Sequence, residues 1–359
     1  MVVNNLRDLD FGILQEFAVD ARVTDMVVSE DGRVWVDLGQ GLRECAPRVP
    51  LTNPALLREY AVWLCAQLGR RLDDACPIAD ASTTSGIRIH AVLAPIVAQG
   101  ASLSIRFPSL NRYNLLDLSK QGMLPKELAY MLSILVKLKA NIAITGSTGS
   151  GKTTLMKALL SVANKNDRIV SVEETRELGE LSVNHVSLSV REANVEGVGE
   201  IGLSQLVKAT LRMRPDRIIL GECRGEEIAD LLRVFTSGHK GGMTTLHADE
   251  VQKVPSRLMS LGLLAGLEPA ALCALAAGAF DVVIHVVRDS YGRRVVQELG
   301  ILEYSAGGTL QGVPVLKIER CKGGSAFMKS LPAWSEFARH WMLPEDIDCM
   351  RSCDFKQLT

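Results

Sequence analysis

The sequence lacks an excess of charge of either sign. Its 40 lysine and arginine residues nearly balance 41 aspartate and glutamate residues, giving a formal net charge of -1. A protein that coats nucleic acid needs a basic surface, so this balance argues against that class. Aromatic residues make up only 5% of the chain, and no stretch interleaves them with basic residues as a single-strand binder requires. We therefore expect no direct nucleic-acid partner.

Long hydrophobic runs are also missing. The most apolar region, residues 261–287, is interrupted by Glu268, Pro269 and Asp281, so no stretch reaches the ~18 uncharged apolar residues that a membrane span needs. The N-terminal sequence MVVNNLRDLDF lacks the charged and then apolar pattern of a secretory signal. These features predict a cytoplasmic protein whose contact with a membrane is peripheral.

The cysteines do not form a metal-binding pattern. The eight cysteines are scattered, and several lie inside apolar runs, which is typical of buried free thiols. Cys349 and Cys353 lie near the C-terminus, but no second pair of cysteines or histidines follows them at a matching spacing. We therefore predict no structural zinc site.

The chain does contain one strongly patterned stretch, IAITGSTGSGKTTLMKALL at residues 142–160. An apolar run, typical of a buried strand, leads into glycines that allow successive N–H groups to converge on an anion. Lys152 then supplies a cation for the outer phosphates of a nucleotide, and the Thr153 hydroxyl supplies a ligand for Mg²⁺. A helix that starts here directs its positive N-terminus at the same phosphates. The predicted phosphate loop comprises Gly146, Ser147, Thr148, Gly149, Ser150, Gly151, Lys152, Thr153 and Thr154.

Carboxylates follow two other apolar runs. Glu173 and Glu174 follow RIVSV, and Glu222 follows RIILG. Ligands of open α/β sheets bind at the carboxyl ends of strands, so both sites should lie beside the phosphate loop. A carboxylate there can hold Mg²⁺ through water or accept a proton from an attacking water. The sequence leaves open which glutamate is the general base.

Two histidines, His239 and His247, bracket a glycine-rich turn and the strand that follows it. This placement predicts that they sense whether the third phosphate is present, with a purely structural role as the alternative. Arg88 and Arg106 lie on two apolar strands predicted nearer the N-terminus. By themselves, these arginines are typical of solvated positions on an edge strand.

The order of the predicted elements indicates two domains. Residues 1–107 predict a small α+β domain, and residues 108–122 are polar and irregular, as in a linker. Over residues 123–305, apolar strands alternate with helices, which indicates an α/β fold with a mainly parallel sheet between helices. Residues 306–359 lose this periodicity, so we expect a C-terminal extension of low order or a small appendage.

Four motifs resemble the signature boxes of the ATPases of type II and type IV secretion systems. They are the phosphate loop (Walker A), VEETREL at residues 172–178 (acidic box), LRMRPDRIILGECRG at 211–225 (Walker B) and GHKGGMTTLHAD at 238–249 (histidine box). NVEG at 194–197, the LRMRPDR run, GIR at 86–88 and SIR at 104–106 are most similar to the tight-adherence (Flp-type) pilus-assembly and conjugal-transfer ATPases.

This resemblance implies a RecA-like P-loop core, the cofactors ATP and Mg²⁺, and hydrolysis of ATP to ADP and phosphate. It also implies a homo-hexameric ring that docks on an inner-membrane platform protein and moves pilin or a secreted protein. Two other functions stay open: a nucleotide-dependent scaffold or switch with little turnover, and an ATPase associated with DNA transfer. Glu173 and Glu222 favour the enzyme.

The resemblance further implies roles for single residues. Thr153, Glu173 and Glu222 are the candidate metal ligands, with Glu173 as candidate general base and Glu222 in the Walker B position. His239 and His247 would relay the nucleotide state, and Arg88 and Arg106 would reach the γ-phosphate. Glu174 departs from the family pattern, which usually has aspartate there, so its part in metal binding is not carried over.

Overall fold

The chain folds into two compact units. The first comprises Met1–Asn111 with Thr175–Gly179, and the second comprises Arg112–Glu174 with Glu180–Thr359. The boundary between Asn111 and Arg112 falls inside the predicted linker. No sequence pattern indicated that Thr175–Gly179 groups with the first unit. The computed structural model describes residues 9–39, 41–108, 113–191, 198–305, 307–320 and 326–352.

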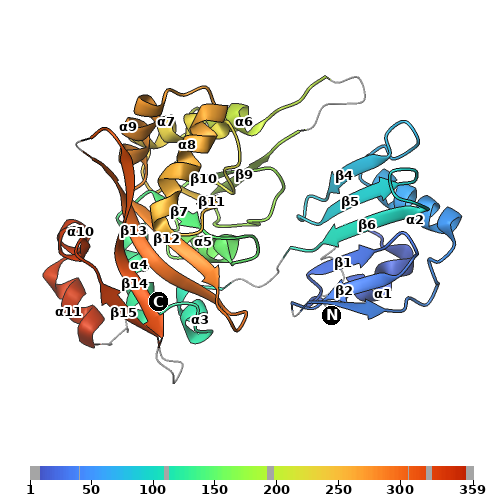
Figure 1. Cartoon of the computed structure of the whole chain (residues 1–359), viewed down its shortest axis with the longest axis horizontal. Helices are drawn as coiled ribbons and strands as arrows, with labels where there is room; N and C mark the ends of the chain where they lie inside the picture. Colours follow the sequence, from blue (N-terminus) through green and yellow to red (C-terminus); the bar gives the residue numbers. More distant parts are fainter. Residues whose placement is uncertain are drawn as a thin grey trace. The chain divides into compact units, whose positions relative to one another are not determined.

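The first unit is built on an antiparallel sheet with the strand order β3-β2-β1-β6-β5-β4 (Figure 1). Helix α2 (Pro54–Ala66) packs on β5 and β6, and the Asn53 side chain begins the helix by accepting a hydrogen bond from the Ala55 N–H at 3.0 Å. Leu57 of α2 shares one buried cluster with alternate strand residues such as Ile89 and Leu103. The strands are β1 (Asp25–Val28), β2 (Val34–Asp37), β3 (Leu42–Cys45), β4 (Ile78–Ser82), β5 (Arg88–Leu93) and β6 (Ala101–Arg106), and a short turn (Gly12–Leu14) leads into α1 (Gln15–Ala18).

The second unit is built on a larger mixed sheet with the strand order β15-β14-β13-β12-β7-β11-β10-β8-β9. The strands from β12 to β9 are parallel to one another, and β13, β14 and β15 are added antiparallel. The strands are β7 (Ile142–Thr145), β8 (Ile169–Glu173), β9 (His185–Ser189), β10 (Arg217–Leu220), β11 (Met243–Leu246), β12 (Val282–Arg288), β13 (Arg294–Tyr304), β14 (Leu310–Arg320) and β15 (Ala326–Ser330).

Two groups of helices pack against the parallel strands. Helices α3, α4 and α5 contact one another, as do α6, α7, α8 and α9, whose side chains form one buried cluster with the sheet (Figure 1). This arrangement confirms the predicted α/β class. The helices are α3 (Leu115–Lys120), α4 (Lys126–Lys137), α5 (Lys152–Leu160), α6 (Leu203–Thr210), α7 (Glu227–Thr236), a short turn (Val251–Lys253), α8 (Val254–Leu264), α9 (Pro269–Ala279), α10 (Trp334–Trp341) and α11 (Pro344–Ser352).

The end of the predicted linker is helical. Asn114 and Asp117 form a capping box that starts α3, and Leu115 and Leu118 are buried against α4 and α5. Part of this linker, residues 109–112, lies outside the described residues. Residues 113–122 therefore belong to the second unit, and the expectation of an irregular segment there was wrong.

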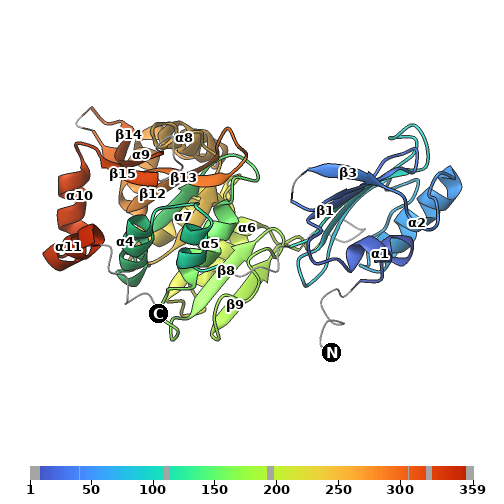
Figure 2. The same cartoon turned by 90° about the horizontal axis from the view of Figure 1, so that it is seen from below.

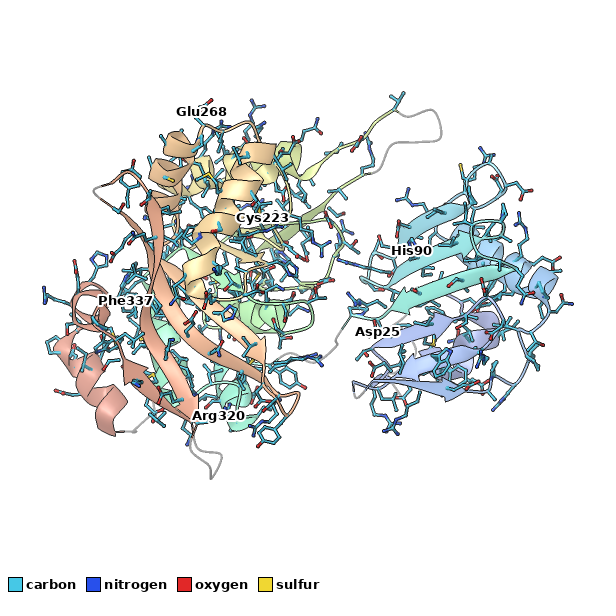
Figure 3. The ribbon with its side chains drawn as sticks, viewed as in Figure 1. Asp25, His90, Cys223, Glu268, Arg320 and Phe337 are labelled. Carbon is cyan, nitrogen blue, oxygen red and sulfur yellow. The ribbon has the colours of Figure 1, made fainter. Side chains whose placement is uncertain are left out.

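The C-terminal region is also more ordered than its sequence suggested. Strands β14 and β15 continue the large sheet, and α10 and α11 lie at this end of it, with β9 at the other (Figure 2). The guanidinium of Arg320, labelled in Figure 3, donates to the Gly122 carbonyl after α3. The expectation of low order was therefore wrong for the described residues of 306–352.

A buried arginine holds the amino ends of the parallel strands together. Arg217, which is 1% exposed, begins β10, and its guanidinium donates to Asp167 at 2.7 Å and to the Val136 carbonyl at 2.9 Å. A buried charge is tolerated only when it is paired in this way. Arg217 thus makes structural contacts at the amino edge of the sheet, whereas the phosphate loop follows the carboxyl end of β7.

Candidate active site

The phosphate loop joins β7 to α5, as the sequence predicted. Gly146, Gly149 and Gly151 have φ values of 148°, 72° and 102°, which residues with a Cβ rarely adopt. A Cβ at Gly146 would also strike the Val286 backbone and approach Ser150 Oγ to 2.7 Å. Gly151 precedes α5, and no side chain caps the helix there. The first N–H groups of α5 are therefore suited to an anion.

Lys152 is held inside this loop. Its side chain is buried, with 7% of the residue exposed, and its ammonium donates to the carbonyls of Gly146 at 2.9 Å and Ser147 at 3.0 Å. The two contacts fix the position of the ammonium group within the loop. A preorganised cation at this position suits the outer phosphates of a nucleotide.

Glu222 lies just beyond the carboxyl end of β10, between a histidine and an arginine. Its Oε1 is 2.6 Å from His247 Nε2, and its Oε2 accepts a hydrogen bond from Arg224 at 2.8 Å. Burial alone would raise the pKa of Glu222, but Arg224, His247 and Lys152 together hold that pKa below its ordinary value of 4.5. Glu222 is therefore ionised at neutral pH, and its side chain keeps 27% exposure to solvent.

Glu173 ends β8 and Glu174 follows it, and the two side chains have different surroundings. Glu173 is buried, with 4% exposed, and its Cγ would lie 3.1 Å from a Cβ built on Gly221, so its place depends on that glycine. Glu174 is exposed and lies 3.4 Å from Arg224. Strand β10 pairs with β8, so both glutamates share the carboxyl edge with Glu222.

The two histidines lie at opposite edges of the sheet. His247 follows β11 at the carboxyl edge, whereas the His239 carbonyl accepts a bond from Asn141, at the amino end of β7. The intervening strand spans about 13 Å at ~3.3 Å per residue. His239 therefore does not flank the phosphate loop of its own chain, and its role in sensing the nucleotide state stays a prediction. The sequence contains a signal for this separation, because the apolar run that forms β11 lies between the two histidines and a strand places its two ends at opposite edges of a sheet.

The predicted arginines of the first unit form a row on its sheet. Arg88 of β5 and Arg106 of β6 are cross-strand partners, and Arg106 is in turn opposite Asp25 of β1. Arg88 lies 2.9 Å from Glu177, and Arg106 Nε donates to Asp25 at 3.1 Å. Figure 3 labels Asp25. These side chains are thus paired on β5 and β6, which are interior strands, and the edge-strand interpretation was wrong.

Sequence reasoning missed a buried histidine next to the loop. His285 of β12 is 1% exposed, and its Nδ1 lies 3.0 Å from the hydroxyl of Thr145, the last residue of β7. Burial lowers the pKa of His285, so the ring is neutral. Its cross-strand partner Glu298 accepts a hydrogen bond from the Val251 N–H at 2.6 Å. Through this pair of residues, Thr145, which directly precedes the phosphate loop, is connected to Val251, which follows the histidine box.

The residues at the carboxyl edge fit a nucleotide with Mg²⁺. The loop provides N–H donors and a cation for phosphates, and Thr153, Glu173 and Glu222 provide oxygen ligands of the kind that Mg²⁺ prefers. Among the described residues, no group of three or more histidine, cysteine, aspartate or glutamate side chains could hold a metal ion by itself. A metal here would therefore share its ligands with the phosphates. No helix in the described ranges is long and apolar enough to cross a bilayer.

Comparison with known sequences agrees with these motifs. The family described as type II/IV secretion system protein matches residues 8–309. A protein of Mycobacterium tuberculosis named for conjugal transfer is 39% identical over 330 residues, which cover 89% of this chain and 93% of that protein. The type IV secretion system protein VirB11 of Brucella suis is 31% identical over 318 residues, covering 79% of this chain and 86% of its own.

Solved structures share the fold. The pilus retraction motor PilT with bound ADP matches with a TM-score of 0.55 and 17% identity, over 84% of this chain and 85% of its own. The ATPase DotB of Legionella pneumophila matches with a TM-score of 0.55 and 21% identity, over 80% and 79% of the two chains. The predicted RecA-like core is thereby confirmed.

Proposed function

Because the chain belongs to the type II/IV secretion system protein family, we propose that it hydrolyses ATP to move pilin or a secreted substrate at the inner membrane. The observation that carries this proposal is the Glu222 site. An ionised carboxylate lies beside a phosphate loop and within electrostatic reach of its lysine. A binding module needs the loop and the lysine, whereas hydrolysis also needs such a group to activate water.

Each residue of the site has a separate part in this reaction. The loop N–H groups and Lys152 bind the phosphates. Thr153, Glu173 and Glu222 would hold Mg²⁺, which would supply neutralising charge at the phosphate oxygens. Glu222 orients the attacking water and accepts its proton, since it is ionised and partly open to solvent. Glu173 is the alternative base, but its burial favours a role in orienting groups over contact with water. His247, which contacts Glu222, relays the nucleotide state.

Assembly and location are carried over from the family. We place the chain in the cytoplasm as a homo-hexamer on an inner-membrane platform protein, with the membrane contacted through that partner. Light scattering of the full chain with saturating ATP and Mg²⁺ should give the mass of a hexamer, and the same sample should release phosphate steadily. A monomer under these conditions would contradict the assembly. A hexamer that binds ATP without turnover would establish the scaffold or switch instead.

An ATPase associated with DNA transfer is the second candidate. The names of the mycobacterial and other relatives refer to conjugal transfer, in which DNA moves between cells. The neutral charge of this chain favours an indirect role, without contact to DNA. Phosphate release should therefore be the same with and without single-stranded DNA. Strong stimulation by DNA would favour the second candidate.

Arg106→Gln should reduce ATP turnover by about 10²-fold or more while ADP binding changes little. We propose that Arg88 and Arg106 close over the γ-phosphate and neutralise charge that develops there, and ADP lacks this group. Steady-state phosphate release and ADP titration measure the two effects. Asp25→Asn is the matched control, because it removes the ion-pair partner of Arg106 and keeps the arginine. An equal loss in Asp25→Asn would assign the effect to the ion pair, and normal turnover in Arg106→Gln would refute the role.

A further inference from the structure

Two arginines on the β12–β13 hairpin lie beside the phosphate loop. Arg288 ends β12, Arg294 begins β13, and the two are cross-strand partners. The Nε of Arg288 donates to the Gly149 carbonyl at 3.1 Å. The Cδ of Arg294 would lie 3.1 Å from a Cβ on Gly151. The hairpin thus contacts the phosphate loop at Gly149 and at Gly151.

The charges of this arginine pair are not balanced within the described part of the chain. Neither Arg288 nor Arg294 forms an ion pair with a described carboxylate, whereas Arg293 between them lies 2.8 Å from Asp289. Like charges directly opposite on neighbouring strands are destabilising. Partial burial of the Arg294 guanidinium, followed by the charge of Arg288, lowers the pKa of Arg294, although arginine stays protonated. Such an arrangement is stabilised when an anion lies beside both groups.

The local packing assigns different parts to the two side chains. Arg288 is tied to the loop through Gly149, so it positions the backbone that must receive the phosphates. Arg294 packs its aliphatic stem over Gly151, which the Met123 side chain also approaches, and the surface of the residue remains exposed to solvent. Its guanidinium has no described ion-pair partner, and its planar donors match phosphate oxygens.

We propose that Arg294 is a further phosphate-binding residue of the nucleotide site and that Arg288 is its positioning residue. This inference rests on the proposed function, because it takes the ligand of the loop to be a nucleotide. The pair supplies positive charge beside the phosphate loop in addition to that of Lys152. Since the interaction is between charges, it also predicts a stronger salt dependence of nucleotide binding than Lys152 alone would give.

Equilibrium titration of the full chain with ATP, ADP and inorganic tripolyphosphate tests this proposal. Arg294→Gln should weaken all three ligands by about 10-fold or more, since a hydrogen bond to a charged group contributes about 1.5–3 kcal/mol. It should also flatten the salt dependence of binding, and Arg294→Lys should restore part of the affinity. Arg288→Gln should weaken the same ligands. Arg293→Gln is the matched control on the same turn and should bind as the wild type does.

The outcomes separate this inference from the proposed function. Unchanged affinity in Arg294→Gln, with normal ATP binding by the wild type, would overturn the inference and leave the function standing. Weaker ATP binding with unchanged tripolyphosphate binding would place Arg294 at the base or sugar and overturn the phosphate assignment. A wild type that binds none of the three ligands would overturn both. If Arg294→Gln loses its cooperative melting transition, the affinities of Arg294→Lys and Arg293→Gln for the three ligands are compared instead. Weaker binding by Arg294→Lys alone supports the inference, and equal binding by the two variants overturns it.

Discussion

Lys152→Ala should abolish ATP binding and hydrolysis together. The ammonium group is buried at the mouth of the loop and is fixed by the Gly146 and Ser147 carbonyls, so alanine removes a preorganised charge that no neighbour can replace. In the complex, the ammonium donates hydrogen bonds to phosphate oxygens, and each hydrogen bond to a charged group contributes about 1.5–3 kcal/mol. The loss of two such bonds to the nucleotide weakens ATP binding by about 10²- to 10⁴-fold.

The measurement for Lys152→Ala is a titration with a fluorescent ATP analogue, followed by a phosphate-release assay. Lys165→Ala is the control, because this lysine is exposed in the turn after α5 and lies outside the loop. It should bind and hydrolyse ATP as the wild type does. ATP affinity at the wild-type level in Lys152→Ala would contradict the assignment of the phosphate site.

Glu222→Gln should keep ATP bound while hydrolysis falls by about 10²-fold or more. Glutamine preserves the volume of the side chain and an oxygen that can accept the hydrogen bond of Arg224, but it carries no charge and cannot accept a proton. Ground-state contacts to the nucleotide come from the loop, so they should survive this change. The general-base contribution, typically 10²- to 10⁴-fold, should be lost.

Single-turnover and steady-state phosphate release measure the effect of Glu222→Gln. Glu226→Gln removes a nearby exposed carboxylate and should leave turnover unchanged. Glu173→Gln in the same assay decides between the two candidate bases, and we expect the smaller loss there. Near-normal phosphate release by Glu222→Gln would refute the role of this residue, and a larger loss in Glu173→Gln would transfer the role to Glu173.

The phosphate loop and the parallel core could be predicted because their signals are local. Ile142–Thr145 is a continuous apolar run that ends at glycine, and the observed strand has these same bounds. Glu173 and Glu222 could be placed at one edge because parallel strands share a direction, and the pairing of β8 with β10 agrees. Each conclusion needed only a short segment and a rule of sheet geometry.

The remaining parts of the site depend on contacts between distant segments. Arg294 reaches Gly151 only because β13 pairs with β12 and β12 pairs with β7, and no motif marks these pairings. Strand β14 was missed because Gly312 interrupts its pattern. A Cβ there would strike the Val251 backbone, so this glycine serves a close approach that the sequence does not reveal.

The most direct test of the central claim is the identity of the nucleotide that each variant retains. Glu222→Gln and Lys152→Ala, each incubated with radiolabelled ATP and Mg²⁺ and passed over a desalting column, should differ sharply. We predict that Glu222→Gln retains intact ATP near one molecule per loop, whereas Lys152→Ala retains no label. If Glu222→Gln instead retained only ADP, or if both variants retained equal ATP, the phosphate loop and Glu222 would not form one hydrolytic site.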